Sequence, residues 1–248
     1  MALRAGANSL MLEARNLCKS YGNRRVVDHV SFTVGKGEII GLLGKNGAGK
    51  TTSFRMTMGM VRPDNGHVFF GGEEISALPM YQRAQRGMGY LPQESSVFRG
   101  LSVRDNLLAI LETRPLSPAE RIDRLEELVQ EFGLERVLES QSSVLSGGER
   151  RRLEVARSLI TNPTLILLDE PFSGVDPIAV SDLQEVIFHL KQKGIGILLT
   201  DHNVRETLAT TDRSYIIYDG RIIAHGDKDE ILADPNARRY YLGERFEM

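Results

Sequence analysis

The sequence has a single cysteine, Cys18, and no long hydrophobic run. One cysteine excludes an internal disulfide and a cysteine-based metal cluster, and it is compatible with a reducing compartment. No apolar stretch approaches the ~18–20 residues that a membrane-spanning helix needs. The first ten residues, MALRAGANSL, also lack the continuous apolar core of a secretory signal. We therefore expect residues 1–10 to be an extension and residues 11–248 to form one domain.

The sequence also lacks a marked excess of either charge. It has 31 Lys and Arg residues against 33 Asp and Glu residues, which gives a net charge of −2. Bulk charge therefore gives no argument for nucleic acid or an anionic membrane as a partner, although a net value hides local patterning. The apolar content of 41% and the charged content of 26% are ordinary for a soluble globular protein.

Three near-continuous apolar runs predict an α/β fold with a mainly parallel sheet. Such runs are typical of central strands that are covered on both faces, with functional groups at their carboxyl ends. The runs are EIIGLLG (38–44), TLILLDEP (164–171) and GIGILLTDH (194–202). Shorter alternating segments around 12–34 and 67–75 predict an additional antiparallel β subdomain.

Helical patterns dominate the middle of the chain. They predict a helical subdomain at about 95–162, inserted in the α/β core. Within it, Ser117 precedes Pro118 and Glu120, which is the pattern of an N-cap, a proline in the first helical position and an acidic first turn. The chain shows no internal repeat or low-complexity tract, so an α/β core with a helical insertion is the expected layout.

The segment GLLGKNGAGKTT contains the P-loop pattern Gly44-x-x-x-x-Gly49-Lys50-Thr51 between a predicted strand and a predicted helix. A helix N-terminus supplies only about 0.3–1 kcal/mol per exposed charge, so it cannot hold the phosphates of ATP alone. The glycines let backbone N–H groups converge, Lys50 adds a full charge, and Thr51 offers a hydroxyl to Mg²⁺. We interpret the segment as an ATP site rather than a glycine-rich turn. Its residues are Gly44, Asn46, Gly47, Ala48, Gly49, Lys50, Thr51 and Thr52.

Polar side chains at the ends of other predicted strands supply the remaining candidate catalytic groups. Asp169 and Glu170 would by themselves be a turn or a helix cap; downstream of a P-loop, Asp169 is expected to hold Mg²⁺ and Glu170 to orient and deprotonate water. His202 is expected to contact the γ-phosphate, although a lone histidine there is usually a surface or capping residue. Gln93 can ligate Mg²⁺ through its amide oxygen and contact the water. Together with Lys50, these residues predict ATP hydrolysis.

The segment VLSGGERRRLEVAR (144–157) raises a different question. Ser146, Gly147 and Gly148 begin a predicted helix, whose free backbone N–H groups attract anions. The segment has no lysine at its glycines and no obvious ligand of its own. By itself it indicates a capped surface helix, with the run Arg150–Arg152 exposed to solvent.

Taken in order, these motifs resemble those of ABC-type ATPases, and the resemblance covers nearly the whole chain from residue 11. LSGGE placed ahead of LLDEP is specific, whereas a P-loop is shared by many enzymes. The resemblance implies that two copies pack head to tail, so that Ser146, Gly147 and Gly148 bind the ATP of the partner. It also implies that Tyr21 stacks on adenine and that Asp176 bridges the subunits near the catalytic water.

Further stretches are similar to the ATPases of lipopolysaccharide exporters. They include RAQRGMGYLPQESSVFRGLSV, LLTDHNVRETL and the tail YLGERF. Membership would imply a homodimer beneath two membrane subunits at the cytoplasmic face of the inner membrane, with short helices of those subunits docked near 93–101. A branched-chain amino-acid importer ATPase is one alternative. A soluble ABC ATPase acting on nucleic acid or ribosomes is another, but the chain lacks the coiled-coil insert, zinc module or second nucleotide domain usual there, so no nucleic-acid partner is expected.

Overall fold

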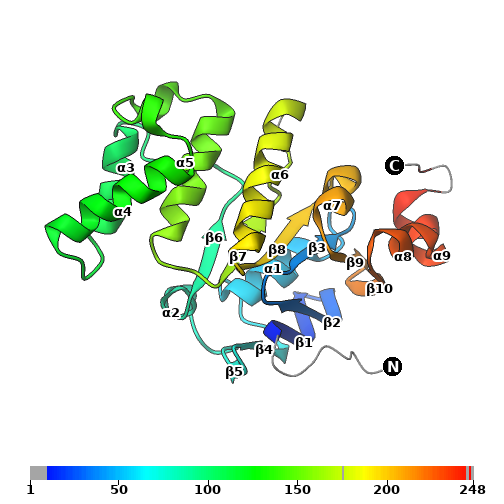
Figure 1. Ribbon diagram of the computed structural model, residues 1–248. Helices are drawn as coiled ribbons and strands as arrows, with labels where there is room; N and C mark the ends of the chain where they lie inside the picture. Colours follow the sequence, from blue (N-terminus) through cyan, green and yellow to red (C-terminus); the bar gives the residue numbers. More distant parts are fainter. Residues whose placement is uncertain (1–9, 175, 244–245, 247–248) are drawn as a thin grey trace.

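The computed structural model describes residues 10–174, 176–243 and 246. Its centre is a six-stranded sheet in the order β10-β9-β3-β8-β7-β6, with five parallel strands and β10 antiparallel to β9 at one edge (Figure 1). Every residue of β3, β7 and β8 is buried, as the apolar runs predict. The strand bounds are β3 Ile39–Leu43, β6 Met88–Leu91, β7 Leu165–Asp169, β8 Gly196–Asp201, β9 Arg213–Tyr218 and β10 Arg221–Gly226.

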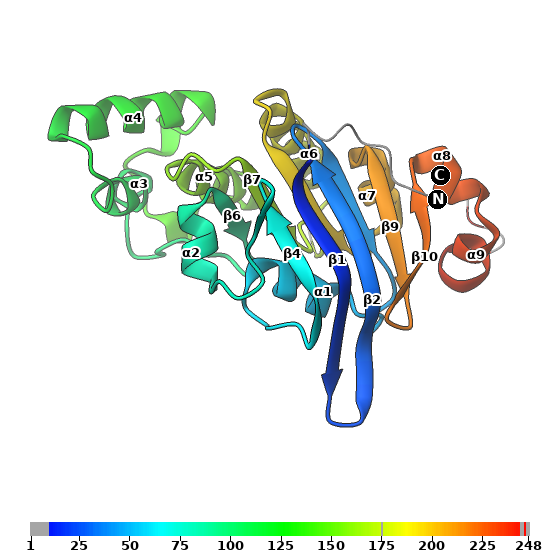
Figure 2. The same cartoon turned by 90° about the horizontal axis from the view of Figure 1, so that it is seen from below.

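The predicted antiparallel layer forms a second sheet in the order β2-β1-β4-β5. Its strands are β1 Leu10–Tyr21, β2 Arg24–Gly35, β4 Asn65–Phe70 and β5 Glu73–Glu74. The long β1–β2 hairpin runs past the central sheet (Figure 2). Side chains of this sheet, such as Phe32, pack with Phe54 of helix α1 (Lys50–Met58) and Leu42 of β3 in one hydrophobic cluster. The small sheet is therefore fixed against the helix that follows the P-loop.

α1 lies on the same face of the central sheet as the small sheet, whereas α3, α4, α5 and α6 contribute to a separate core on the other face. α3, α4 and α5 form a group beside the sheet (Figure 1), and Leu107, Leu128 and Leu153 of these helices share a core with Leu199 of β8. Among the described helices, none is long and apolar enough to cross a membrane. The bounds are α1 Lys50–Met58, α2 Met80–Gln85, α3 Val103–Leu111, α4 Pro118–Glu131, α5 Gly147–Leu159, α6 Pro177–Gln192, α7 Val204–Thr210, α8 Lys228–Ala233 and α9 Pro235–Ala237.

The start of α4 shows why a local pattern can be read directly. The Ser117 side chain accepts a hydrogen bond from the Glu120 backbone N–H, and the Glu120 carboxylate accepts one from the Ser117 N–H. Pro118 occupies the first helical turn, where it has no intrahelical donor to lose. The predicted cap is thus present as a reciprocal capping box.

A buried arginine closes the far end of α1. Arg83 of α2 is 1% exposed, and its guanidinium donates to the backbone carbonyls of Met56, Thr57, Leu78 and Ser76 at 2.5–3.1 Å. Burial lowers the pKa of Arg83 to about 10. Two of these carbonyls, those of Met56 and Thr57, belong to the last turn of α1, where carbonyls outnumber the available N–H donors; the Met56 carbonyl also accepts the Gly59 N–H at 3.2 Å. Arg83 therefore ties the P-loop helix to the segment that leads into β6.

We expect Arg83→Ala to lower the free energy of unfolding by about 2–3 kcal/mol, because it leaves buried carbonyls without donors. Urea titration would measure the change. The matched control is Arg86→Ala: Arg86 is on the same segment, but its side chain is 41% exposed and its nearest carboxylate, on Glu73, is 3.9 Å away. Equal losses in the two variants would contradict the role assigned to Arg83.

Candidate functional site

The loop between β3 and α1 is shaped as a phosphate cradle. Gly49 precedes α1 with a φ of 109°, a left-handed conformation that favours glycine, and a Cβ built there would lie 2.6 Å from the Val26 carbonyl oxygen. α1 begins at Lys50 with no side-chain cap on its first turn. Its first backbone N–H groups therefore remain available to an anion at the loop.

Lys50 is buried inside this loop and held by the backbone. Lys50 is only 4% exposed. Its Nζ donates hydrogen bonds to the carbonyl oxygens of Gly44 at 2.6 Å and Lys45 at 3.2 Å. Burial lowers the pKa of Lys50, while the carboxylates of Glu170, Asp201 and Asp169 raise it. The ammonium thus faces the acidic ends of β7 and β8. Lys45 itself is exposed.

The ends of β6, β7 and β8 bring three of the predicted side chains together. Gln93 Nε2 is 3.3 Å from Glu170 Oε2, and His202 Nδ1 is 3.5 Å from the same oxygen. Asp169 ends β7 and accepts a hydrogen bond from the Thr200 hydroxyl at 2.9 Å. Parallel strands place their carboxyl ends at one edge of the sheet, which explains why residues 77 to 109 positions from Gln93 meet there.

One cavity is bordered by the P-loop and this sheet edge. The residues that border it are Arg24, Val26, Asn46, Gly47, Gly49, Lys50, Thr51, Thr52, Glu170, Ser173 and His202. Arg24 and Val26 are not among the site residues predicted from the sequence, since nothing local marks them; Ser173 is not among them either, although it precedes the predicted Asp176 by three positions. Tyr21 is not among these residues; its side chain is 53% exposed at the end of β1, with Lys19 Nζ 5.8 Å from the ring centroid.

The LSGGE segment begins α5 as a capped helix. Ser146 Oγ accepts a hydrogen bond from the Glu149 N–H, and the Glu149 carboxylate accepts one from the Ser146 N–H. Neither Ser146 nor Gly148 borders the P-loop cavity. Gly147 and Gly148 border a separate cavity together with Gln93, Glu170 and Asp176, among other residues. Within one copy of the chain, Ser146, Gly147 and Gly148 of the LSGGE segment therefore do not border the P-loop cavity.

A model of the ABC transporter family matches residues 27–173, more than half of the sequence. The chain belongs to this family. It is an ATP-binding subunit of an ABC transporter, and the ATPase activity and P-loop fold with antiparallel and helical subdomains that the sequence predicts are confirmed.

Similar proteins cover almost the whole of this ABC ATPase. The lipopolysaccharide export system ATP-binding protein LptB of Escherichia coli (strain K12) is 56% identical, covering 96% of this chain and 99% of that protein. LptB of Acidithiobacillus ferridurans is 54% identical, over 97% and 100%. The ADP conformation of MJ1267, an ATP-binding cassette of an ABC transporter, matches with a TM-score of 0.84 and 29% identity, over 94% and 99%.

The arginine run of α5 in this ABC ATPase is partly covered rather than fully exposed, and the sequence-based prediction of a solvent-exposed run is wrong for Arg151. The Arg151 side chain is 16% exposed and pairs with Glu154, 6% exposed, at 2.8 Å. Arg150 donates to the Leu145 carbonyl at 3.0 Å. Glu154 also accepts from the Ser96 N–H at 3.2 Å, which ties the segment after Gln93 to α5. A helical pattern shows spacing, but not that a distant loop will cover the helix.

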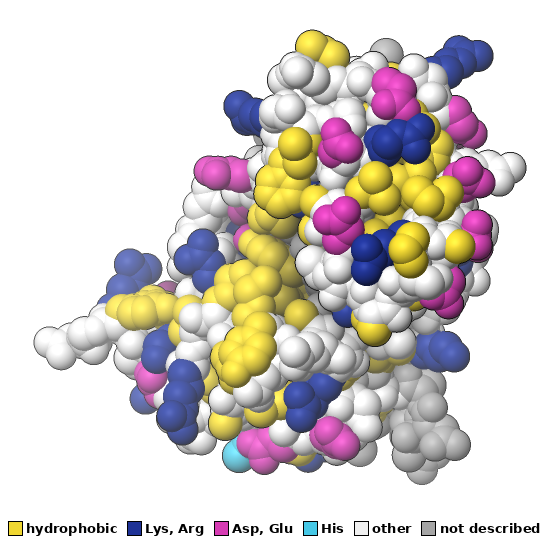
Figure 3. Space-filling model, turned by 90° about the vertical axis from the view of Figure 1, so that its left-hand side faces the viewer, with side chains coloured by type: hydrophobic (Ala, Val, Ile, Leu, Met, Phe, Trp, Pro, Cys, Tyr) yellow, Lys and Arg dark blue, Asp and Glu magenta, His cyan; other side chains and the backbone are white. Residues whose placement is uncertain are grey.

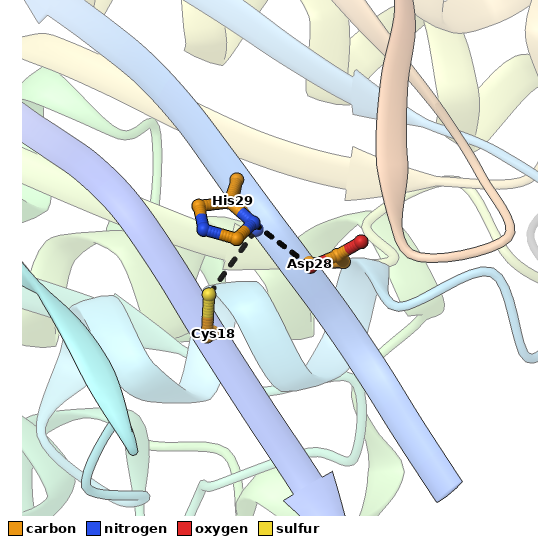
Figure 4. Close-up of side chains that lie close together, drawn as sticks. All are labelled: Cys18, Asp28 and His29. Carbon is orange, nitrogen blue, oxygen red and sulfur yellow. Dashed lines mark hydrogen bonds and ion pairs between the residues drawn. The ribbon is translucent and has the colours of Figure 1, made fainter.

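A second group of potential metal ligands lies away from the nucleotide cavity. Cys18, Asp28 and His29 place ligand atoms within 4.8 Å of one another (Figure 4). Both Asp28 oxygens are already engaged: Arg221 donates to Oδ2 at 2.7 Å, and Arg25 donates to Oδ1 at 2.9 Å. With His29, these arginines lower the pKa of Asp28 to about 2. Two guanidinium groups on the only carboxylate of the group disfavour a cation, so we assign no metal to it.

Proposed function

We propose that this chain is the ATPase of a lipopolysaccharide exporter, acting as a homodimer beneath two membrane subunits at the cytoplasmic face of the inner membrane. The observation that carries the proposal is the 56% identity to an LptB over nearly the full length of both chains. A match confined to the nucleotide motifs would fit any transporter of the family. Here the similarity extends through the helical subdomain, which is the part expected to contact membrane subunits.

The geometry of the P-loop supports ATP as the ligand of the cavity. The N–H groups at the start of α1 and the buried Lys50 ammonium provide donors for the β and γ phosphates. Phosphate oxygens can replace the Gly44 and Lys45 carbonyls as acceptors from Lys50 Nζ. We propose that Tyr21 covers the adenine from the tip of β1, outside this cavity.

The same region offers oxygen ligands of the kind that Mg²⁺ prefers. They are the Thr51 hydroxyl, the Asp169 carboxylate and the Gln93 amide oxygen, of which Asp169 is held by Thr200. When bound, Mg²⁺ would neutralise charge on the β and γ phosphates. The fit rests on this donor set beside a lysine-bearing phosphate loop.

We propose that Glu170, with Gln93 and His202, activates the water that attacks the γ-phosphate. Glu170 lies between the P-loop cavity and the cavity bordered by Gly147 and Gly148, and it borders both. Its carboxylate can orient a water and accept its proton. His202, 3.5 Å from Glu170, would donate to the γ-phosphate, and Gln93 would hold the water.

We assign the completion of the site to a second copy of the chain. Ser146 caps α5 and Gly147 and Gly148 open it, so the segment supplies a hydroxyl and helix N-terminal N–H groups, and none of the three residues borders its own P-loop cavity. A head-to-tail partner would place these donors on the open side of ATP, replacing water around the γ-phosphate. Asp176 is exposed and borders the same cavity as Glu170, Gly147 and Gly148. We propose that it contacts the partner subunit there.

The docking surface for the membrane subunits is assigned to the face shown in Figure 3. Hydrophobic side chains gather in a depression on this face, between the helical subdomain and the rest of the chain. Phe98 and Leu101, within the segment 93–101, are 47% and 38% exposed. Tyr81 of α2 is 62% exposed. An apolar depression of this kind suits an amphipathic helix of a membrane subunit.

Phe98→Asp should reduce recovery of the membrane subunits with this chain by at least ~10-fold, because a buried aromatic anchor carries much of an interface's binding free energy. The measurement is quantitative mass spectrometry of the tagged chain purified after detergent extraction. Ile122→Asp on α4 is the control, since Ile122 is 43% exposed but lies outside the segment 93–101.

The same purification tests the proposed function. Two membrane subunits that release lipopolysaccharide from proteoliposomes in an ATP-dependent reaction would support it. Recovery of an amino-acid permease, or of RNA without membrane subunits, would reject it.

A further inference from the structure

One buried carboxylate joins the loops that carry Glu170 and His202. Asp201, the last residue of β8, is 0% exposed. Its Oδ2 accepts a hydrogen bond from the Phe172 backbone N–H at 2.8 Å. Its Oδ1 accepts from the N–H groups of His202 at 2.7 Å and Asn203 at 2.8 Å. The two oxygens thus hold two different loops.

The Phe172 bond holds a strained turn in place. Glu170 has a φ of 45°, a left-handed conformation that is uncommon for a residue with a side chain and persists only where surrounding contacts enforce it. The Glu170 N–H donates to the Thr200 carbonyl at 2.8 Å, and the Asp201 carboxylate receives the N–H two residues later. These bonds from β8 fix the chain on both sides of the Glu170 side chain.

The other oxygen fixes the turn between β8 and α7. By accepting from His202 and Asn203, it sets the backbone direction from which the His202 side chain leaves the sheet. Asn203 then caps α7 through the Glu206 N–H. The result is the 3.5 Å separation between His202 Nδ1 and Glu170 Oε2.

We propose that Asp201 is a positioning residue that sets the geometry of Glu170 relative to His202. This inference rests on the roles proposed above for those two residues. A carboxylate is required because three N–H donors converge on two oxygens. An asparagine has only one acceptor oxygen, and its NH₂ group would face an N–H on one of the two loops. Bonds to the charged acceptor are also the stronger ones.

Asp201→Asn in the full-length protein tests the proposal through a split between kcat and KM. Because Asp201 does not border the P-loop cavity and no group that would contact ATP is replaced, we expect kcat for ATP hydrolysis to fall about 10- to 100-fold, with KM for ATP within about 2-fold of wild type. Asp212→Asn is the control. Asp212 also accepts a hydrogen bond from a backbone N–H, that of Ile39 at 2.9 Å, but it does so at the amino end of β3, whereas Asp201 lies at the carboxyl end of β8.

A double-mutant cycle separates positioning from general support of the fold. If Asp201 acts through His202 and Glu170, Asp201→Asn should lower kcat by a much smaller factor in the His202→Ala background than in the wild type. The same factor in both backgrounds would overturn the proposal, as would wild-type kcat in folded Asp201→Asn. Asp201→Ser is the second variant if Asp201→Asn does not fold, with the same expected split. Failure of both to fold would make Asp201 a stability residue and would also overturn it.

Glu170→Gln distinguishes failure of the positioning role of Asp201 from failure of the proposed catalytic role of Glu170. Full activity of Glu170→Gln would reject the proposed catalytic site. Loss of activity in Glu170→Gln with wild-type kcat in Asp201→Asn would reject the positioning role alone.

Discussion

Glu170→Gln should lower kcat for ATP hydrolysis by at least ~100-fold, which is the lower range expected for removal of a general base. The amide keeps the shape of the side chain but cannot accept the proton of the attacking water. ATP binding should persist, and it should tighten rather than weaken, because a negative charge that acts on Lys50 is removed from beside the phosphates. The variant should therefore accumulate as an ATP-bound dimer.

Two measurements check this expectation together: steady-state phosphate release, and dimer formation with ATP by size-exclusion chromatography. Glu139→Gln is the matched control, since Glu139 is 71% exposed and pairs only with Arg104 among the ion pairs of the described residues. Steady-state hydrolysis at the wild-type rate in Glu170→Gln would refute the role. Loss of ATP binding would instead place Glu170 in nucleotide recognition.

Features that depend on neighbouring residues could be predicted from the sequence. β3 and the P-loop could be predicted from an apolar run followed by closely spaced glycines. Glycine is needed in this loop because a Cβ at Gly49 would clash with the backbone. The cap of α4 follows from Ser117 and Glu120, three positions apart. The meeting of Gln93, Glu170 and His202 follows from one further rule, that parallel strands present their carboxyl ends at a common edge.

Features that depend on distant partners could not be predicted in this way. Arg83 reads as one of several arginines near the end of a short helix, yet it is the buried one because α1 ends beside it. Asp201 reads as an acidic residue next to a histidine, and its bond to Phe172 spans 29 positions. Arg151 was expected in solvent but is covered and paired with Glu154. In each case burial is decided by a segment far away in sequence.

The sharing of each ATP between two copies leads to the second large effect. Ser146→Arg should lower ATP hydrolysis at least ~100-fold, because the long side chain blocks the donors that complete the partner's site. Lys50→Ala should do the same by removing the buried ammonium from the P-loop. Each variant alone then lacks one half of every site in its homodimer.

Mixing the two inactive variants should restore hydrolysis, and only if the sites are shared. In a mixed dimer the P-loop of the Ser146→Arg chain keeps Lys50, and it faces the Ser146 of the Lys50→Ala chain, so one site has both halves intact. The control mixes Ser146→Arg with a chain carrying both substitutions, in which no site has an intact Ser146. Differently tagged chains verify that mixed dimers form. If these dimers form and yet hydrolyse no ATP, Ser146 does not act on the partner's nucleotide, and the capping bond to Glu149 within its own chain becomes the better account of its position.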